Sequence, residues 1–274
     1  MKKFNQKKLE NKAKSIRKIM IDMGYSCGTS AHFGGGLSMV ESLTVLYDSV
    51  LRYRKSNTRW ENRDRFILSK GHGVLGFYAT LFKFGLIGKA ELDSFQKNES
   101  EFIAHPIMDL DYGIESSNGS LGHGLSLGIG IALAARKKNM NYRTFVMLGD
   151  GECNEGSVWE AVMCASHFKL NNLVAIVDRN SMQNDGLDED VMKFHSIASS
   201  WKSFGWDVRD IDGHNLKDLY EGFKPDPKLS KPRVIIANTI KGKGIPFMEG
   251  VPSWHHGKLT EETYKQAVKE LKNA

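Results

Sequence analysis

Two short apolar runs with a helix-like segment between them constrain the fold of this chain more than any other feature. Residues 145–148 form the first run, which stops at Gly149-Asp150-Gly151, and residues 173–178 form the second, which is followed closely by Asn180. Both runs have the length and composition of buried strands, and residues 157–169 between them have helical spacing. The segment therefore predicts a βαβ unit, in which the two strands are parallel and the helix crosses between them.

Polar residues follow both predicted strands. The carboxylate of Asp150 and the amide oxygen of Asn180 should face one crevice, because open parallel sheets bind ligands at the carboxyl ends of their strands. Both are hard oxygen ligands, suited to Mg²⁺ or Ca²⁺. Gly149 and Gly151 let the backbone approach a phosphate closely, and amides at the following helix start can face an anion. The pattern predicts a divalent metal that bridges the protein to a diphosphate. The tripeptide alone is equally typical of a turn in which Asp150 only caps a helix, but its pairing with Asn180 favours the metal.

Helical and extended patterns alternate along the rest of the chain. This alternation predicts an α/β fold with a doubly wound, mostly parallel sheet flanked by helices. We expect one domain over residues 1–274, with a basic docking helix at about 5–23. The other predicted helices cover residues 39–51, 74–84, 131–138 and 261–271, the other strands cover 65–68, 206–211 and 233–239, and glycine-rich loops cover 28–36 and 119–130.

Length and charge exclude several classes of protein. A chain of 274 residues with 41% apolar content can bury one large core. The net charge of +6 comes largely from residues 2–18, where apolar side chains at helical spacing indicate a helix with a basic solvated face. No nucleic-acid-binding motif accompanies that face, so we expect no nucleic acid partner. No apolar run reaches eighteen residues, and the three cysteines lack CxxC spacing. We therefore expect no membrane span and a cytoplasmic location.

Histidines in loops carry the remaining chemistry of the sequence. Each lies near glycine or proline rather than on an apolar helix face, and each taken alone is typical of a structural or surface histidine. Together they indicate a site, because loops at strand ends gather catalytic groups and neutral histidines exchange protons near pH 7. The series comprises His32, His72, His105, His123, His255 and His256.

The spacing of these motifs resembles the N-terminal domain of the transketolase family over nearly the whole chain, in the same order. The segment from Gly149-Asp150-Gly151 to Asn180 looks like the thiamine diphosphate signature, with Arg179-Asn180 at its usual Asn-Asn ending. The other matching segments are Ser30-Ala31-His32, Arg63 to His72, Ala104-His105-Pro106, Gly119 to Gly124, Glu155, Lys241 to Gly244 and His256-Gly257.

The resemblance implies roles for individual residues. Thiamine diphosphate and a divalent metal, Mg²⁺ or Ca²⁺, would be the cofactors. The metal would be bound by Asp150, Asn180 and the backbone carbonyl of Met182. The positions matching His72 and His256 would contact the diphosphate, and those matching His32, His105 and His256 would line the pocket beside the thiazolium and the substrate. Glu155 matches a carboxylate at a subunit interface near the cofactor, and we group it with these three histidines as a catalytic residue. The remaining cofactor-binding positions are Gly119, Ser120, Leu121, Gly149, Gly151 and Glu152.

Three departures from the family pattern concern the donor end of the site. The family usually has Pro near Ser120 and often Gln at His123, and the loop after His32 differs at residues 34–36. These changes affect the expected donor preference rather than cofactor binding. His255 is not part of the pattern and receives no role from it.

The resemblance also implies an incomplete active site. In the family, a glutamate of a second, pyrimidine-binding domain drives the cofactor into its reactive form, and this chain ends at Ala274 before such a domain. We expect a split transketolase, completed by a separate subunit with the pyrimidine-binding and C-terminal domains, in a homodimer of heterodimers. It would transfer a two-carbon ketol group from a ketose phosphate to an aldose phosphate. Alternatives are an α-type subunit of a thiamine-dependent 2-oxoacid dehydrogenase or decarboxylase, and a non-catalytic regulatory homologue.

Overall fold

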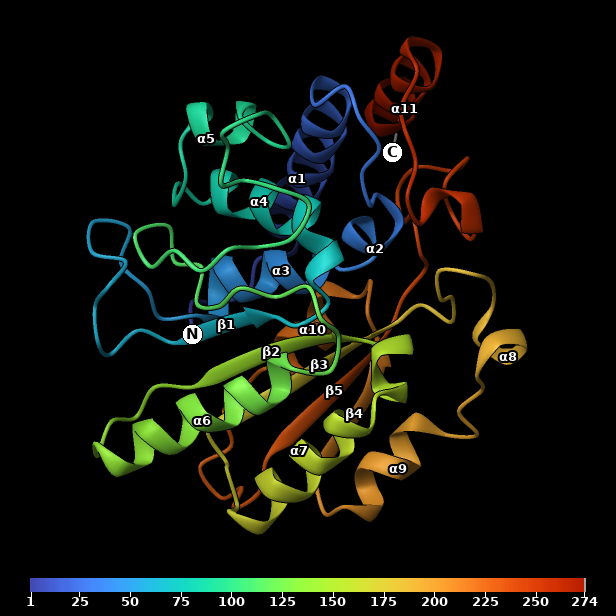
Figure 1. The fold of residues 1–274 in the computed structure, drawn as a ribbon. Helices are drawn as coiled ribbons and strands as arrows, with labels where there is room; N and C mark the ends of the chain where they lie inside the picture. The colour runs from blue at the N-terminus through green and yellow to red at the C-terminus, as the bar shows by residue number, and fades with distance from the viewer. Residues whose placement is uncertain (274) are drawn as a thin grey trace.

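Five parallel strands form the centre of the molecule, and helices cover both faces (Figure 1). The structure is a computed structural model, and it describes residues 1–273. The strands are β1 (Arg65–Leu68), β2 (Thr144–Gly149), β3 (Leu173–Arg179), β4 (Asp207–Asp212) and β5 (Arg233–Asn238). The α-helices are α1 (Gln6–Ser26), α2 (Gly34–Leu37), α3 (Val40–Val45), α4 (Val74–Lys83), α5 (Lys89–Asp93), α6 (Gly124–Lys137), α7 (Gly156–His167), α8 (Asp188–Val191), α9 (Ile197–Ser203), α10 (Leu216–Gly222) and α11 (Glu261–Asn273). A π-helix, η1 (Leu46–Val50), and three 3₁₀ turns, η2 (Gly71–Gly73), η3 (Gly151–Asn154) and η4 (Pro252–Trp254), complete the elements.

The sheet has the strand order β1-β2-β3-β5-β4. β2 and β3 pair in register from Thr144 with Leu173 to Gly149 with Asp178, so the two strands end side by side. The predicted βαβ unit is confirmed, because α7 connects these two strands. The predicted doubly wound sheet is confirmed as well, and the observed strand bounds lie within one residue of those read from the sequence.

Alternate side chains of each central strand face opposite layers of helices. Phe145 and Met147 of β2 belong to a core shared with α1, α3, α4 and α10, whereas Val146 and Leu148 belong to a core shared with α6 and α7. Figure 1 shows these two groups of helices on opposite sides of the sheet. A strand that is apolar on both faces is typical of a parallel sheet covered by helices on both sides.

The bounds predicted for α6 were wrong. The helix begins at Gly124 rather than near residue 131, inside the segment predicted to be a glycine-rich loop. The glycines are there because the helix lies very close to its neighbours. A Cβ at Gly124 would lie 2.4 Å from Ser69 Oγ, and one at Gly128 would lie 2.5 Å from Val146 Cγ2. Close packing against β1 and β2 offsets the poor helix propensity of glycine.

The glycine-rich segment 28–36 and the helix predicted over 39–51 also differ from the structure. The first ends in helix α2, and the second divides into α3 and the π-helix η1. Every residue of these elements is buried, so tertiary packing rather than local propensity determines their bounds. Among residues 1–273, no helix is both long and apolar enough to cross a bilayer.

Substituting Gly128→Ala should destabilise the chain. Overpacking against β2 costs about 1–3 kcal/mol, which exceeds the roughly 0.5–1 kcal/mol that alanine gains over glycine in a helix. Gly130→Ala is the matched control, because no atom lies within 4 Å of its Cβ position. That variant should be as stable as the native chain or slightly more stable. Urea denaturation of both variants measures the difference, and equal stabilities would contradict this account of the α6 glycines.

Candidate functional site

A cleft of about 410 Å³ lies at the carboxyl ends of four neighbouring strands. Lys70 and His72 follow β1, Asp150 follows β2, Asn180 follows β3, and Lys241 follows β5. This is the edge where open α/β sheets bind ligands. Of the residues singled out in the sequence, the cleft is lined by His72, Leu121, Gly149, Asp150, Gly151, Glu152, Glu155, Asn180, Met182 and His255.

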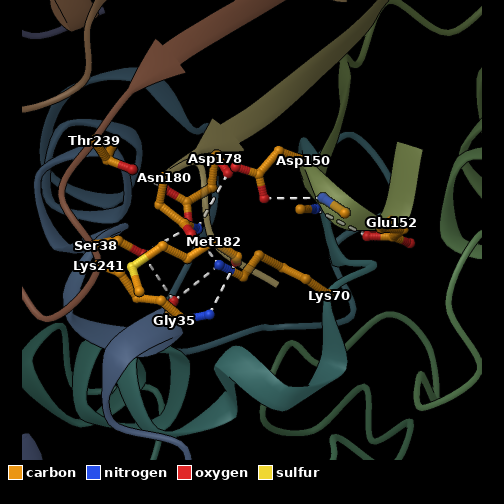
Figure 2. A network of polar contacts seen from close by, with 12 residues as sticks. Gly35, Ser38, Lys70, Asp150, Glu152, Asp178, Asn180, Met182, Thr239 and Lys241 are labelled. Carbon is orange, nitrogen blue, oxygen red and sulfur yellow. Dashed lines mark hydrogen bonds and ion pairs between the residues drawn. The ribbon is translucent and has the colours of Figure 1, made fainter. Parts of the chain in front are cut away.

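The floor of the cleft is organised around Asp178, the penultimate residue of β3, which is 1% exposed. Its carboxylate forms a buried ion pair with Lys70 and accepts hydrogen bonds from Ser38 Oγ at 2.6 Å and Thr239 Oγ1 at 2.6 Å. Figure 2 shows Lys70, Asn180 and Lys241 around it. Burial raises the pKa of Asp178, but Lys70 and these hydroxyl donors outweigh burial and hold the pKa below its ordinary value. The aspartate is therefore ionised and already paired within the protein.

Asp150 and Asn180 have the properties of cation ligands. The Asp150 carboxylate accepts backbone hydrogen bonds from Ser181 at 2.6 Å and Gly151 at 2.9 Å. Burial, followed by the nearby carboxylates of Asp188 and Asp178, raises the pKa of Asp150. The side-chain oxygen of Asn180 is buried and has no hydrogen-bond partner among residues 1–273, whereas its Nδ2 donates to Asp178 Oδ2 at 3.2 Å. A cation would relieve both the crowded negative charge and the unpaired oxygen.

The cleft offers few side-chain ligands for a metal ion, so backbone oxygens would have to contribute. The described residues contain no group of three or more His, Cys, Asp or Glu side chains placed to hold a metal. A cation in the cleft would therefore depend on the Asn180 amide and on carbonyls such as that of Met182. This carbonyl accepts a hydrogen bond from Lys241 Nζ at 3.0 Å, as does the carbonyl of Gln183 at 3.0 Å.

Lys241 brings positive charge to the cleft. Burial and then the neighbouring Lys70 lower the pKa of Lys241 to about 8, so the ammonium form still predominates at neutral pH. Lys70 is paired with the Asp178 carboxylate, whereas the hydrogen bonds of Lys241 go to backbone carbonyls. Among residues 1–273, Lys241 forms no ion pair, and an unpaired ammonium group in the cleft favours an anionic ligand.

Glu152 holds the turns that border the cleft. Its buried carboxylate accepts hydrogen bonds from Ser69 Oγ, from the Gly122 amide at 2.9 Å and from the Gly149 amide at 3.0 Å. Burial raises the pKa of Glu152, and these donors oppose that effect. With its oxygens engaged inside the chain, Glu152 acts as a positioning residue for the glycine-rich turns.

Four histidine rings cluster around that of His32, and two of them, His72 and His255, line the cleft. The His32 ring centroid lies 4.4 Å from His256, 5.5 Å from His255, 5.6 Å from His72 and 6.0 Å from His105. Burial is the main cause that lowers the pKa of His32, to about 4, and it also lowers the pKa values of His72 and His105. Near neutral pH these three rings are uncharged, and each can accept or donate a proton.

The predicted residues divide into two groups in space. His32, His105 and His256 gather beside the cleft rather than lining it, and Gly119 and Ser120 line a neighbouring open hollow of about 380 Å³. His123 lines that hollow as well. Glu155 is an exposed residue of the cleft lining and occupies the N-cap position of α7, where its side chain makes no capping hydrogen bond.

Sequence reasoning missed Lys70, Asp178 and Lys241 as site residues, and it included His255 only as a member of the histidine series, without a role. A usable signal existed for both lysines, because each lies just beyond the end of a predicted strand, as Asp150 does. In the sequence, Asp178 directly continues the apolar run of residues 173–177 and so resembles one more strand residue. His255 carried no signal that distinguishes it from its neighbour His256.

A second buried network supports the loop that carries Lys241. Glu41 forms an ion pair with Arg17 at 2.7 Å and lies 3.0 Å from His214 Nδ1. His214 Nε2 accepts a hydrogen bond from the Ile240 amide at 2.8 Å, and Arg17 Nε donates to the Lys243 carbonyl at 2.8 Å. The network therefore holds the backbone on both sides of Lys241.

Comparisons with known proteins agree on one family. The chain matches the family described as "Transketolase, thiamine diphosphate binding domain" over residues 9–273. It is 41% identical over 264 residues to a subunit of the apulose-4-phosphate transketolase of Phocaeicola vulgatus, covering 96% of this chain and 93% of that protein. It is 38% identical over 264 residues to the 6-deoxy-6-sulfo-D-fructose transketolase subunit SqwG of a Clostridium species, covering 96% of each.

The fold matches solved transketolases. The Campylobacter jejuni transketolase superposes with a TM-score of 0.89 at 28% identity. That superposition covers 98% of this chain and 43% of the other, so the chain spans less than half of that solved protein.

Substituting Glu41→Gln should reduce stability in a pH-dependent way. Burial raises the pKa of Glu41, but Arg17 and His214 outweigh it and lower the pKa from 4.5 to about 2. The stabilisation by the carboxylate is therefore complete above pH 4.5 and is lost as the pH falls towards 2. We expect the free energy of unfolding of the variant to be about 3 kcal/mol lower than that of the native chain at pH 7, because Arg17 stays buried without its partner. Urea denaturation at several pH values from 7 to 3 measures the difference in unfolding free energy between the native chain and the variant. This difference should become smaller as the pH falls.

The exposed pair between Glu261 and Lys265 provides the control. Both side chains are 70% exposed, so Glu261→Gln should change stability by less than about 1 kcal/mol. A Glu41→Gln variant as stable as this control at pH 7 would contradict the role given to the buried network.

Proposed function

This chain belongs to the transketolase family, and from that premise we propose that it binds thiamine diphosphate and a divalent metal in the cleft at the carboxyl edge of its sheet. We propose further that it transfers a two-carbon ketol group from a ketose donor to an aldose acceptor, together with a second subunit.

The observation that carries the proposal is the buried, unpartnered Oδ1 of Asn180 in the cleft lined by the Asp150 carboxylate. An amide oxygen without a hydrogen-bond partner is costly to bury, and a hard cation is a ligand that would satisfy it. The proposed metal ligands are Asp150, Asn180 and the Met182 carbonyl, with Mg²⁺ or Ca²⁺ as the ion. The Met182 carbonyl accepts a hydrogen bond from Lys241, and because a carbonyl oxygen has two lone pairs it could keep that bond and also bind the metal.

The cofactor's diphosphate would lie against the metal and the cationic side of the cleft. Lys241 supplies positive charge there, and Gly149, whose Cβ position has no atom nearer than 3.8 Å, leaves room for a phosphate oxygen near the backbone. His72 and Leu121 also line the cleft. Thiamine diphosphate, when bound, supplies the nucleophilic carbon that breaks and makes the carbon–carbon bond. The chain's own task is to hold the cofactor and exclude water from it.

His32, His105 and His256 are the proposed proton carriers. Burial keeps His32 and His105 uncharged near neutral pH, so their ring nitrogens can take a proton from a sugar hydroxyl or return one to it. Their position beside the cleft rather than in it suits contact with a substrate that extends outward from the cofactor. Gly119 and Ser120 line the neighbouring hollow, and we propose that they contact the thiazolium end of the cofactor.

A separate subunit is proposed to complete the site. Two relatives that this chain covers almost completely are named as transketolase subunits, while the Campylobacter jejuni transketolase is more than twice as long as the matched region. The partner would carry the pyrimidine-binding and C-terminal domains, and Glu155 at the cleft mouth would meet it. A homodimer of heterodimers is the proposed assembly.

The proposed substrates are sugars with an anionic group. One relative is named for apulose-4-phosphate and another for 6-deoxy-6-sulfo-D-fructose, and both names describe sugars with a phosphate or sulfo group. The proposed location is the cytoplasm, which fits the free thiols of Cys27, Cys153 and Cys164.

Asp150→Asn tests the metal assignment. Native chain with saturating Mg²⁺ and thiamine diphosphate should be stabilised by about 2.7 kcal/mol at a ligand concentration of 100 times Kd. The variant should lose this stabilisation, because an amide is a poorer ligand for Mg²⁺ than a carboxylate. Asp190→Asn is the control, since Asp190 is exposed on α8 and does not line the cleft. Thermal unfolding with and without both ligands gives the result, and equal stabilisation of both variants would refute the assignment.

Reconstitution tests the reaction and its alternatives. The chain mixed with a subunit resembling the missing transketolase domains should transfer a ketol group between sugar phosphates, and neither of the two proteins should be active on its own. Turnover of pyruvate instead would favour the 2-oxoacid alternative. Cofactor binding without any turnover in the reconstituted complex would favour a regulatory homologue.

A further inference from the structure

We propose that His255, rather than its neighbour His256, is the histidine that works beside His72 at the diphosphate end of the cleft, donating a ring N–H to a phosphate oxygen. His256 would act only with His32 and His105, which lie beside the cleft. This inference rests on the proposed function, since it assigns a residue to the diphosphate subsite of the same cofactor.

The two adjacent histidines occupy different places. His255 lines the cleft with Asp150, Asn180 and Lys241, and His256 does not. The His255 ring stacks on the His72 ring with centroids 5.3 Å apart and an interplanar angle of 26°. The ring of His256 instead packs against His32 at 4.4 Å.

A backbone bridge determines this arrangement. Ala31 and Gly257 exchange two hydrogen bonds, of 2.8 and 3.0 Å, and so align the segment before Gly257 with the segment that begins at His32. Upstream, the Trp254 ring packs edge-on against Phe33 at 5.9 Å. Contacts on both sides hold the two histidines, so exchanging their positions would require breaking the bridge.

The His255 ring has unused hydrogen-bonding capacity. Its Nδ1 is buried and has no partner among residues 1–273. Burial, followed by Lys241, His32 and Lys70, lowers the pKa of His255 to about 3, so the ring is neutral and carries one N–H near pH 7. A phosphate oxygen accepts such a hydrogen bond without requiring a further charge on the protein.

Packing provides the competing explanation. The His255 ring could serve only to hold His72 in place through their stacked faces, with no contact to a ligand. The two roles need different parts of the side chain, since stacking requires the flat ring and donation requires the N–H. Two substitutions separate them, because His255→Phe keeps a ring and removes the donor, whereas His255→Gln keeps an N–H donor and removes the ring.

Calorimetric titration of the full chain with inorganic pyrophosphate at saturating Mg²⁺ tests the proposal. His255→Phe should weaken pyrophosphate binding by about tenfold or more, the effect of losing one hydrogen bond to a charged acceptor. His255→Gln should stay closer to the native affinity than His255→Phe does. His256→Phe is the matched neighbour, and it should bind pyrophosphate within about twofold of the native chain.

Each other outcome has a definite meaning. Native affinity in His255→Phe, equal losses in the Phe and Gln variants, or a larger loss in His256→Phe would overturn the assignment of His255. If the native chain itself fails to bind pyrophosphate with Mg²⁺, the proposed function fails and the inference fails with it. If the native chain binds pyrophosphate and His255→Phe binds it equally well, only this inference fails and the proposed function stands.

Discussion

The buried ion pair between Lys70 and Asp178 connects the parts of this molecule that form its cleft. Lys70 follows β1 and Asp178 lies near the end of β3, so the pair spans β2 between them. Lys70 also donates to the Gly35 carbonyl at 2.9 Å, and Asp178 accepts from Ser38 and from Thr239 beyond β5. Segments far apart in the chain thus meet at one carboxylate. Burying such a pair costs desolvation, and the additional hydrogen bonds to both partners make the burial tolerable.

Because Asp178 is paired with Lys70, Asp150 and Lys241 remain to interact with a ligand in the cleft. With Lys70 paired to Asp178 and Glu152 engaged by backbone amides, the remaining charged residues that line the cleft are Asp150, Glu155, Asp185 and Lys241. Of these, the Asp150 carboxylate and the Lys241 ammonium are buried, whereas Glu155 and Asp185 are exposed. The carboxylate suits a cation, and the ammonium suits an anion. The Arg17, Glu41 and His214 network holds the loop around Lys241 from behind, so the position of the ammonium depends on residues that do not line the cleft.

Much of the fold could be predicted because its signals are local. The alternation of apolar strands and amphipathic helices sets the order of elements, and the residues just beyond the strands identify Asp150 and Asn180. Prediction failed where packing opposed propensity. Gly124 and Gly128 indicated a loop, yet they lie in α6, where only glycine permits such close contact with Ser69 and Val146.

The sequence by itself determined the family, the parallel sheet and the group of polar residues at its carboxyl edge, because strand periodicity and motif spacing are properties of contiguous residues. Only the tertiary structure decided how that group divides. Glu152 lies on the Gly149-Asp150-Gly151 turn but is engaged by Ser69 and Gly122, and His255 rather than His256 faces the cleft. The Ala31–Gly257 bridge and the packing of Trp254 on Phe33 set the positions of these histidines. Both are contacts between segments at opposite ends of the chain, and local spacing carries no information about them.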